Sequence, residues 1–114
     1  MSTRSTIWIK REDGLEGVYC HFDGYLSNNG EILYKQYSDV KTLETLIANG
    51  EMSSLGDTVD NTEFYDEGNS NYKVKTIKDT EKYAEEYNYI FIDGGWFYYE
   101  DDSGDLKRLE PSLI

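Results

Sequence analysis

YIFIDGGWFYY, residues 89–99, is the stretch of the sequence that decides the fold. Its two halves, residues 89–92 and 95–99, are rich in the β-branched and aromatic residues that favour strands. Asp93-Gly94 stands between them, and such a pair is typical of a type I′ turn because both central residues of that turn need positive φ. The stretch therefore predicts a β-hairpin.

A second hairpin is expected near the start of the chain. Residues 6–11 and 17–23 are short β-prone runs, and the polar segment 12–16 between them includes a glycine. Residues 72–77 alternate between apolar and polar side chains and predict another strand. A short strand is also expected at Phe64-Tyr65, inside an acidic stretch that otherwise predicts a surface loop.

Helix signals fill the region between these strands. The turn 27–30 predicts the start of a short helix that carries Ile32, Leu33 and Tyr37. Ser38 or Asp39 is expected to cap a second helix, whose apolar face consists of Val40, Leu43, Leu46 and Ile47. A further short helix, capped by Asp79, is expected over residues 80–87.

These signals predict one α+β domain that spans residues 1–114. We expect a mainly antiparallel sheet of about four to five strands, with two to three short helices packed on one face. The helices are expected to pack through Leu33, Leu43, Leu46 and Ile47. The expected core on the sheet side is Ile7, Ile9, Val18, Phe22, Ile90, Ile92 and Phe97.

The chain carries a formal net charge of −12, from 23 Asp and Glu residues against 11 Lys and Arg residues. Such a surface repels nucleic-acid phosphates and anionic membranes, and it attracts basic protein surfaces. We therefore expect a protein partner, with neither direct nucleic-acid binding nor membrane binding. The sequence leaves open whether the protein is a monomer or a dimer.

The sequence predicts a soluble, cytoplasmic protein. Residues 1–13 lack the apolar segment of a signal peptide, and no apolar run approaches the roughly 20 residues of a membrane span. Cys20 is the single cysteine, so it has no intrachain disulfide partner. This cysteine usage fits a reducing compartment.

Most of the negative charge lies in the second half of the chain. Residues 57–114 hold 15 acidic and 6 basic residues, so about −9 of the −12 is there. The densest cluster, Glu100-Asp101-Asp102 with Asp105, directly follows the aromatic run 96–99. Strand alternation is expected to turn some of these aromatic side chains to solvent, which suits docking onto an Arg- and Lys-rich surface. A solvated turn that keeps a sheet edge soluble is the alternative.

The same acidic cluster does not have the spacing of a calcium-binding EF-hand loop, so we expect no metal there. Around Cys20, strand alternation places Tyr19, His21 and Asp23 on one face and Cys20 on the other. Cys20 and His21 therefore point apart, which argues against a nucleophile pair or a shared zinc ion. We expect no enzyme activity and no cofactor.

Several segments resemble a family of small uncharacterised proteins from bacteriophages and prophages. The resemblance rests on MSTRSTI (1–7), YCHFDGY (19–25), NGEIL (29–33), EYNY (86–89) and DGGW (93–96). It implies a phage context and expression in the bacterial cytoplasm. No activity is established for that family, so the resemblance assigns no catalytic residue.

Phage context and acidity together favour a counter-defence inhibitor that occupies the basic nucleic-acid channel of a host defence protein, such as a CRISPR effector. Spaced carboxylates would stand where phosphates bind. The expected charges are Asp57, Asp60, Asp66, Glu67, Glu100, Asp101, Asp102 and Asp105. The expected aromatic contacts are the exposed members of Tyr65, Tyr72, Tyr98 and Tyr99.

Two other functions remain open at this point. One is a small-molecule binder, such as a sponge for a nucleotide immune signal, with a polar and aromatic pocket formed by Arg4, Tyr19, His21, Asp23 and Tyr25. The other is a structural interaction module. In a purely structural role, His21 and Asp23 would fix the strand end and the turn that follows.

Overall fold

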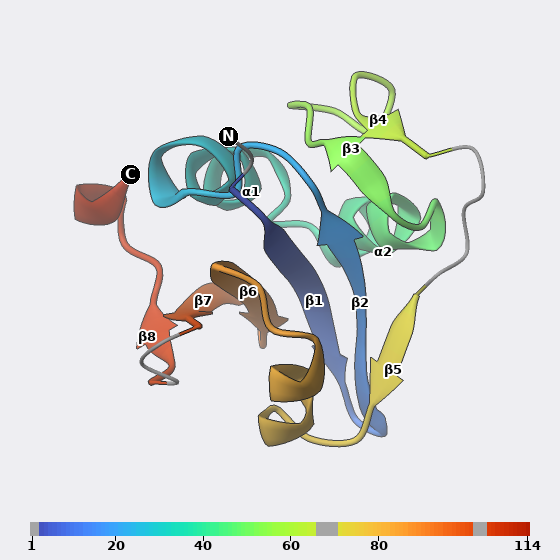
Figure 1. Cartoon of the computed structure of the whole chain (residues 1–114), viewed down its shortest axis with the longest axis vertical. Helices are drawn as coiled ribbons and strands as arrows, with labels where there is room; N and C mark the ends of the chain where they lie inside the picture. Colours follow the sequence, from blue (N-terminus) through green and yellow to red (C-terminus); the bar gives the residue numbers. More distant parts are fainter. Residues whose placement is uncertain (1–2, 66–70, 102–104) are drawn as a thin grey trace.

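The computed structural model describes residues 3–65, 71–101 and 105–114. Its centre is a mixed sheet in which β1 (Ser5–Arg11) and β6 (Tyr87–Ile92) run parallel to each other (Figure 1). β2 (Gly14–Cys20) lies antiparallel to β1, and β7 (Gly95–Glu100) lies antiparallel to β6. Each hairpin is thus joined to the other through its first strand.

Four short strands extend this centre. β3 (Met52–Ser54) runs parallel to β2, and β4 (Glu63–Phe64) pairs with β3. β5 (Tyr72–Val74) pairs with the first half of β2, and β8 (Lys107–Arg108) pairs with β7. The predicted α+β class is confirmed, but the sheet has eight strands rather than four or five. β3 and β8, for which the sequence predicts no strand, have only three and two residues and are too short to give a periodic signal.

Both predicted hairpins are present. Asp93 and Gly94 have φ values of 49° and 83°, as the expected turn between β6 and β7 requires. The first hairpin closes earlier than expected, because β2 begins at Gly14, and β2 also ends earlier, at Cys20. Because β2 ends at Cys20, the strand alternation expected for residues 21–23 does not apply to their side chains.

The helices lie on both sides of the sheet. A π-helical turn η1 (Leu26–Gly30) leads into α1 (Glu31–Gln36), and α2 (Val40–Ala48) follows. The Asp39 carboxylate accepts a hydrogen bond from the Thr42 backbone N–H at 3.0 Å, which confirms the expected cap. The helix expected over residues 80–87 is instead the 3₁₀ helix η2 (Lys78–Tyr83). A short 3₁₀ turn η3 (Pro111–Leu113) lies near the end of the chain.

α1 and α2 cover one face of the sheet and enclose the main core. Val40, the first residue of α2, is exposed and Ile32 is half-buried. The other expected helix residues are buried, namely Leu33, Tyr37, Leu43, Leu46 and Ile47. The predicted helix residues Leu33, Leu43, Leu46 and Ile47 and the predicted sheet residues Ile7, Ile9 and Val18 are all confirmed in this core.

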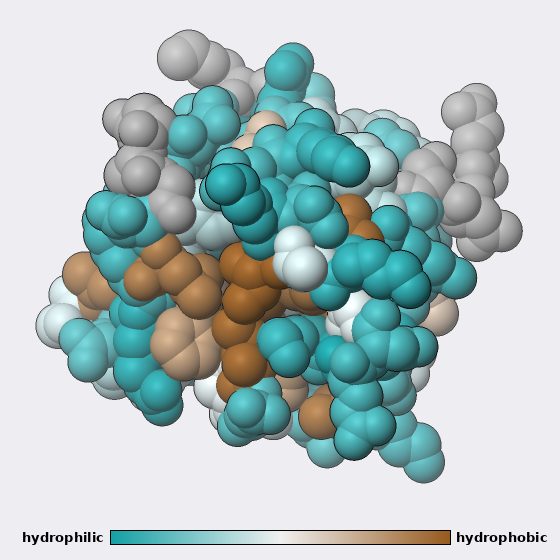
Figure 2. All heavy atoms as spheres, turned by 90° about the horizontal axis from the view of Figure 1, so that it is seen from below, coloured by the Kyte–Doolittle hydropathy of each residue, from teal (hydrophilic) through white to brown (hydrophobic). Residues whose placement is uncertain are grey.

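The opposite face of the sheet, here called the second face, carries a smaller core of Trp8, Leu15, Ile90 and Tyr99. Ile90 is therefore buried as predicted, but in this smaller core rather than in the core under α1 and α2. Ile92 and Phe97 are half-buried. Figure 2 shows apolar residues between hydrophilic ones on the lower side of the molecule.

The core prediction for Phe22 is wrong, because this side chain is 42 % exposed. β2 ends two residues earlier, so the alternation that would have turned Phe22 inward no longer applies. Its ring packs instead edge-on against the ring of His21, with centroids 4.5 Å apart.

We predict that Gly17→Ala destabilises the fold strongly. Trp8 is fully buried, and a Cβ atom at Gly17 would lie 2.5 Å from Cε3 of its indole ring. We expect a loss of about 2 kcal/mol or more in the free energy of unfolding, measured by urea denaturation. Gly94→Ala is the control. A Cβ there meets nothing within 4 Å, so only the positive φ should cost stability, about 1 kcal/mol. A Gly17 variant as stable as the wild type would contradict this packing.

A polar network ties β5 and α2 to the first hairpin. Arg11 donates from its guanidinium to Glu16 at 2.7 Å and to Glu44 at 3.2 Å. The Asn71 amide donates to Glu16 at 2.9 Å and to the Ile47 carbonyl at 3.1 Å. The hydrogen bond from Arg11 lowers the pKa of Glu16, with a smaller contribution from Asn71.

We predict that Glu16→Gln removes a pH-dependent part of the stability. A carboxyl whose pKa is lowered by folding stabilises the protein above its ordinary pKa of 4.5, and this contribution is lost as the pH falls through the lower folded value. At pH 7 the variant should be about 1 kcal/mol less stable, since the half-exposed Arg11 is partly screened. Urea denaturation at pH 7 and pH 3 measures both values. An equal deficit at both pH values would contradict the assigned ion pair.

Candidate functional site

One end of the second face carries a row of polar residues across four strands, three of them buried and Tyr19 half-buried. Thr6 lies opposite Tyr19 on one side and Asn88 on the other, and Asn88 lies opposite Tyr99. The Thr6 hydroxyl donates to Asn88 Oδ1 at 2.7 Å and accepts from the Trp8 indole N–H at 2.8 Å. Thr6 and Asn88 are fully buried, so these hydrogen bonds fix the row.

Asn88 also holds the segment that enters β6. Its Oδ1 atom accepts from the Glu85 backbone N–H, and its amide donates to the Glu85 carbonyl, both at 2.9 Å. Glu85 is thereby anchored over the row. The sequence interpretation missed Glu85, because no motif links it to Asn88. The sequence did contain one signal for this contact. Asn88 lies within an otherwise apolar strand, and a buried asparagine side chain needs hydrogen-bond partners nearby.

An aromatic stack lies beside this row. The rings of Tyr72 and Tyr83 are stacked, with centroids 4.2 Å apart and planes 12° apart. Both rings also contact the buried Trp8, at centroid distances of 5.7 Å and 6.2 Å. Tyr83 remains 37 % exposed. A rigid aromatic surface therefore meets solvent at the junction of β5 and η2.

Two carboxylates act electrostatically on this surface. Burial raises the pKa of both Tyr19 and Tyr72, and the charges of Glu51 and Glu85 raise both values further, while Arg4 lowers that of Tyr19. Glu51 and Glu85 therefore lie within electrostatic reach of both rings. The two glutamates come from different segments, one preceding β3 and one preceding β6.

The pKa of Glu85 itself is raised. Burial is the main cause, and the neighbouring charges of Asp101 and Glu86 add to it, whereas Arg4 and His21 lower it. The Glu86 carboxylate accepts a hydrogen bond from the Arg4 backbone N–H at 3.3 Å. Charged groups that flank the ends of β1, β2, β6 and β7 thus influence one another at this end of the sheet.

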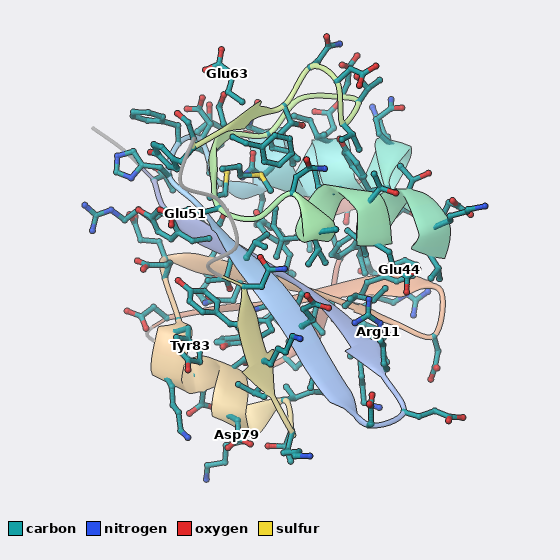
Figure 3. The ribbon with its side chains drawn as sticks, turned by 90° about the vertical axis from the view of Figure 1, so that its right-hand side faces the viewer. Arg11, Glu44, Glu51, Glu63, Asp79 and Tyr83 are labelled. Carbon is teal, nitrogen blue, oxygen red and sulfur yellow. The ribbon has the colours of Figure 1, made fainter. Side chains whose placement is uncertain are left out.

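We call this surface the tyrosine–carboxylate face. Figure 3 shows Glu51 and Tyr83 in the left half of the view, away from Arg11 and Glu44 in the right half. The face consists of Arg4, Tyr19, His21, Glu51, Tyr72, Tyr83, Glu85, Glu86 and Asp101.

Three of the five residues expected in a small-molecule pocket belong to this face. The hydroxyl of Tyr19 and Nδ1 of His21 are hydrogen bonded at 2.7 Å, and Arg4 lies nearby. Asp23 and Tyr25 instead shape the turn before η1, where their backbone carbonyls accept hydrogen bonds from the chain that follows. Among the hydrogen bonds of the described residues, His21 pairs with Tyr19 and not with Asp23.

The predicted aromatic contacts are corrected in part. Tyr98 and Tyr99 are only 4 % and 3 % exposed, so they offer no contact surface. The reason is that both faces of β7 are covered, Tyr98 lying in the main core and Tyr99 in the second. Tyr65 is exposed and Tyr72 half-buried, so both stay available.

The predicted charges are spread over more than one region. Asp57 and Asp60 are exposed between β3 and β4, and Asp105 is exposed before β8. Glu100 is half-exposed and lies 3.9 Å from Lys107. Asp101 joins the tyrosine–carboxylate face. The remaining three, Asp66, Glu67 and Asp102, lie outside the described residues.

The described surface has several open hollows. One, of about 300 Å³, lies where the first hairpin meets β5 and is lined by residues that include Arg11, Lys73 and Lys75. A second, about 220 Å³, is lined by Glu86, Tyr87, Glu100 and Asp101. The third, about 210 Å³, lies beside the turn of the β6–β7 hairpin. None of these three is lined by the five residues of the expected small-molecule pocket.

The described residues contain no group of three or more His, Cys, Asp or Glu side chains placed to hold a metal ion. The Cys20 thiol is buried, which raises its pKa, and it accepts a hydrogen bond from Asn29 at 3.4 Å. This environment disfavours the reactive thiolate. Within the described part of the chain, no helix has the length and apolarity to cross a membrane.

Comparison with known proteins gave no match to a family model, to a curated protein or to a solved structure. The candidate site therefore rests on the chemistry of its own residues.

We predict that Glu85→Gln stabilises the protein at neutral pH. A carboxyl whose pKa is raised by folding destabilises the protein when it is charged, so stability falls as the pH rises through the window above the ordinary value of 4.5. Gln removes this penalty, and we expect a gain of a few tenths of a kcal/mol at pH 7, since the group is only partly buried. The gain should vanish below pH 4. Thermal unfolding at both pH values tests it, and a less stable variant at pH 7 would contradict the assigned environment.

Proposed function

We propose that this chain is a non-catalytic binding protein that docks on a basic, nucleic-acid-binding surface of a host protein and blocks it. In a phage context this makes it a counter-defence inhibitor that resembles anti-CRISPR proteins in its action. The phage context comes from the sequence resemblance. The binding mode comes from the tyrosine–carboxylate face.

The observation that carries the proposal is that two stacked tyrosines, Tyr72 and Tyr83, lie close to several carboxylates. Tyr72 and Tyr83 are held in a stack on a buried indole ring, so ordering them on binding costs little conformational entropy. The charges of Glu51 and Glu85 reach the Tyr72 ring, and Glu86 adds its charge close to Glu85. Rigid tyrosines supply contact energy, and carboxylates supply attraction to a basic partner.

The overall charge supports the same partner. A net charge of −12 attracts a basic surface over several ångströms before contact. A channel that binds nucleic acid is such a surface, because much of its affinity comes from neutralising phosphates. The exposed acids away from the face, Asp57, Asp60 and Asp105, contribute to this long-range attraction.

The test is competition with nucleic acid. Proteins captured from a host lysate at low salt are purified, and the nucleic-acid affinity of each is measured with and without the chain. We expect one captured protein to lose its nucleic acid when the chain is added. We also expect the affinity of the chain for it to fall about tenfold or more between low and moderately high salt.

Matched variants assign the effect to the face. Glu86→Gln with Asp101→Asn removes two charges from it, whereas Glu12→Gln with Glu110→Gln removes two exposed charges elsewhere. The first pair should weaken binding about tenfold and the second less than about threefold. If nucleic acid stays bound to every captured protein, the proposal is wrong. If the two pairs weaken binding equally, the assignment to this face is wrong.

A further inference from the structure

We infer that the stacked Tyr72 and Tyr83, together with Glu51 and Glu85, form a binding site for an arginine side chain of the partner. We call these four residues the arginine site. The inference rests on the proposed function and deepens it, because it names the chemical group by which a basic partner is recognised.

The position of the site follows from the strand register. Tyr72 pairs with Gly17 on β2, and Tyr19 comes two residues further along the same strand face. Glu51 directly precedes β3, whose Met52 pairs with Cys20, so Glu51 arrives beside Tyr19. Glu85 is held over the same end of the sheet by its two hydrogen bonds to Asn88. Two carboxylates and two aromatic rings therefore converge from four segments.

The chemistry of these groups fits a guanidinium ion. A planar cation stacks on the face of a tyrosine ring, and its N–H groups pair with carboxylates at its edge. Tyr83 has one ring face against Tyr72 and is still 37 % exposed, so ring surface remains accessible. The buried Trp8 supports both rings from below.

The carboxylates of the site lack a cation of their own. Among the described residues, neither Glu51 nor Glu85 forms a salt bridge, although four other carboxylates of the chain do. Arg4 lies within electrostatic reach of Glu85 and Tyr19, and it moderates the charge without pairing. A bound cation would also relieve the repulsion of Glu85 by Asp101 and Glu86.

A lysine would gain less at this site. An ammonium ion is compact and strongly hydrated, and it cannot pair with a carboxylate through two parallel N–H groups while it stacks on a ring. We therefore expect the arginine site to discriminate between two basic partners of equal charge. Electrostatic attraction by the whole acidic surface would not discriminate between them.

The experiment measures the affinity of the full chain for two peptides of equal charge, hexa-arginine and hexa-lysine, by calorimetry at low salt. We expect hexa-arginine to bind about three- to tenfold more tightly. Glu51→Gln with Glu85→Gln should remove this preference. The control Glu12→Gln with Glu110→Gln should retain it, since it removes the same charge from distant exposed positions.

A second pair of variants tests the rings. Tyr83→Ala should lower hexa-arginine affinity about fivefold, whereas Tyr25→Ala removes a similarly exposed tyrosine elsewhere and should change it less than about twofold. Circular dichroism confirms that each variant is folded.

The outcomes separate this inference from the proposed function. If both peptides bind equally and the Glu51 and Glu85 variants bind like the control, the arginine site is wrong, but attraction to basic partners stands. If neither peptide binds at low salt, both the arginine site and the proposed function are wrong.

Discussion

The structure depends on the parallel pairing of β1 with β6, which joins two hairpins from opposite ends of the chain into one sheet. With both hairpins joined, the sheet is wide enough to need cover on two sides. α1 and α2 supply it on one face, and η2 supplies it on the other, where the Tyr72 and Val74 side chains of β5 also pack. The second cover is smaller, because η2 is a short 3₁₀ helix, and aromatic side chains therefore stay partly exposed around it.

The same pairing positions the candidate site. It brings Thr6 of β1 beside Asn88 of β6, and these two buried side chains satisfy each other. Asn88 then has enough remaining hydrogen-bonding capacity to hold the backbone of Glu85. A buried polar network is costly unless every member is paired, so it specifies one geometry. The position of the tyrosine–carboxylate face is thus a consequence of core structure rather than of a surface loop.

The sequence predicted the parts of the fold that rest on local patterns. The Asp93-Gly94 turn and the Asp39 cap follow from residue types at fixed positions, and both are confirmed. The short strands β3 and β8 were not predicted, because their three and two residues carry no periodicity. Phe22 was misplaced for a related reason, since nothing local marks the end of β2 at Cys20.

The candidate site was less predictable than the fold. Charge and tyrosine content indicated a basic partner, and Arg4, Tyr19 and His21 were recognised as a group. The stack of Tyr72 on Tyr83 could not be predicted from the sequence, and neither could the positions of Glu51 and Glu85 near it. These residues come together through strand pairings between distant segments, which no local pattern reveals. Some of the aromatic residues 96–99 were expected at the surface, with Tyr98 and Tyr99 as candidates, because helices were expected on one face of the sheet only. Both faces of β7 are covered instead.

The central claim is that binding is local to the tyrosine–carboxylate face rather than spread over an acidic surface. Nuclear magnetic resonance of the isotope-labelled chain, titrated with hexa-arginine at low salt, tests it most directly. The account predicts the largest backbone shift changes at Tyr19, Glu51, Tyr72, Tyr83 and Glu85, with small changes at Asp57, Asp60 and Glu110. Changes of similar size at all exposed acidic residues would contradict it.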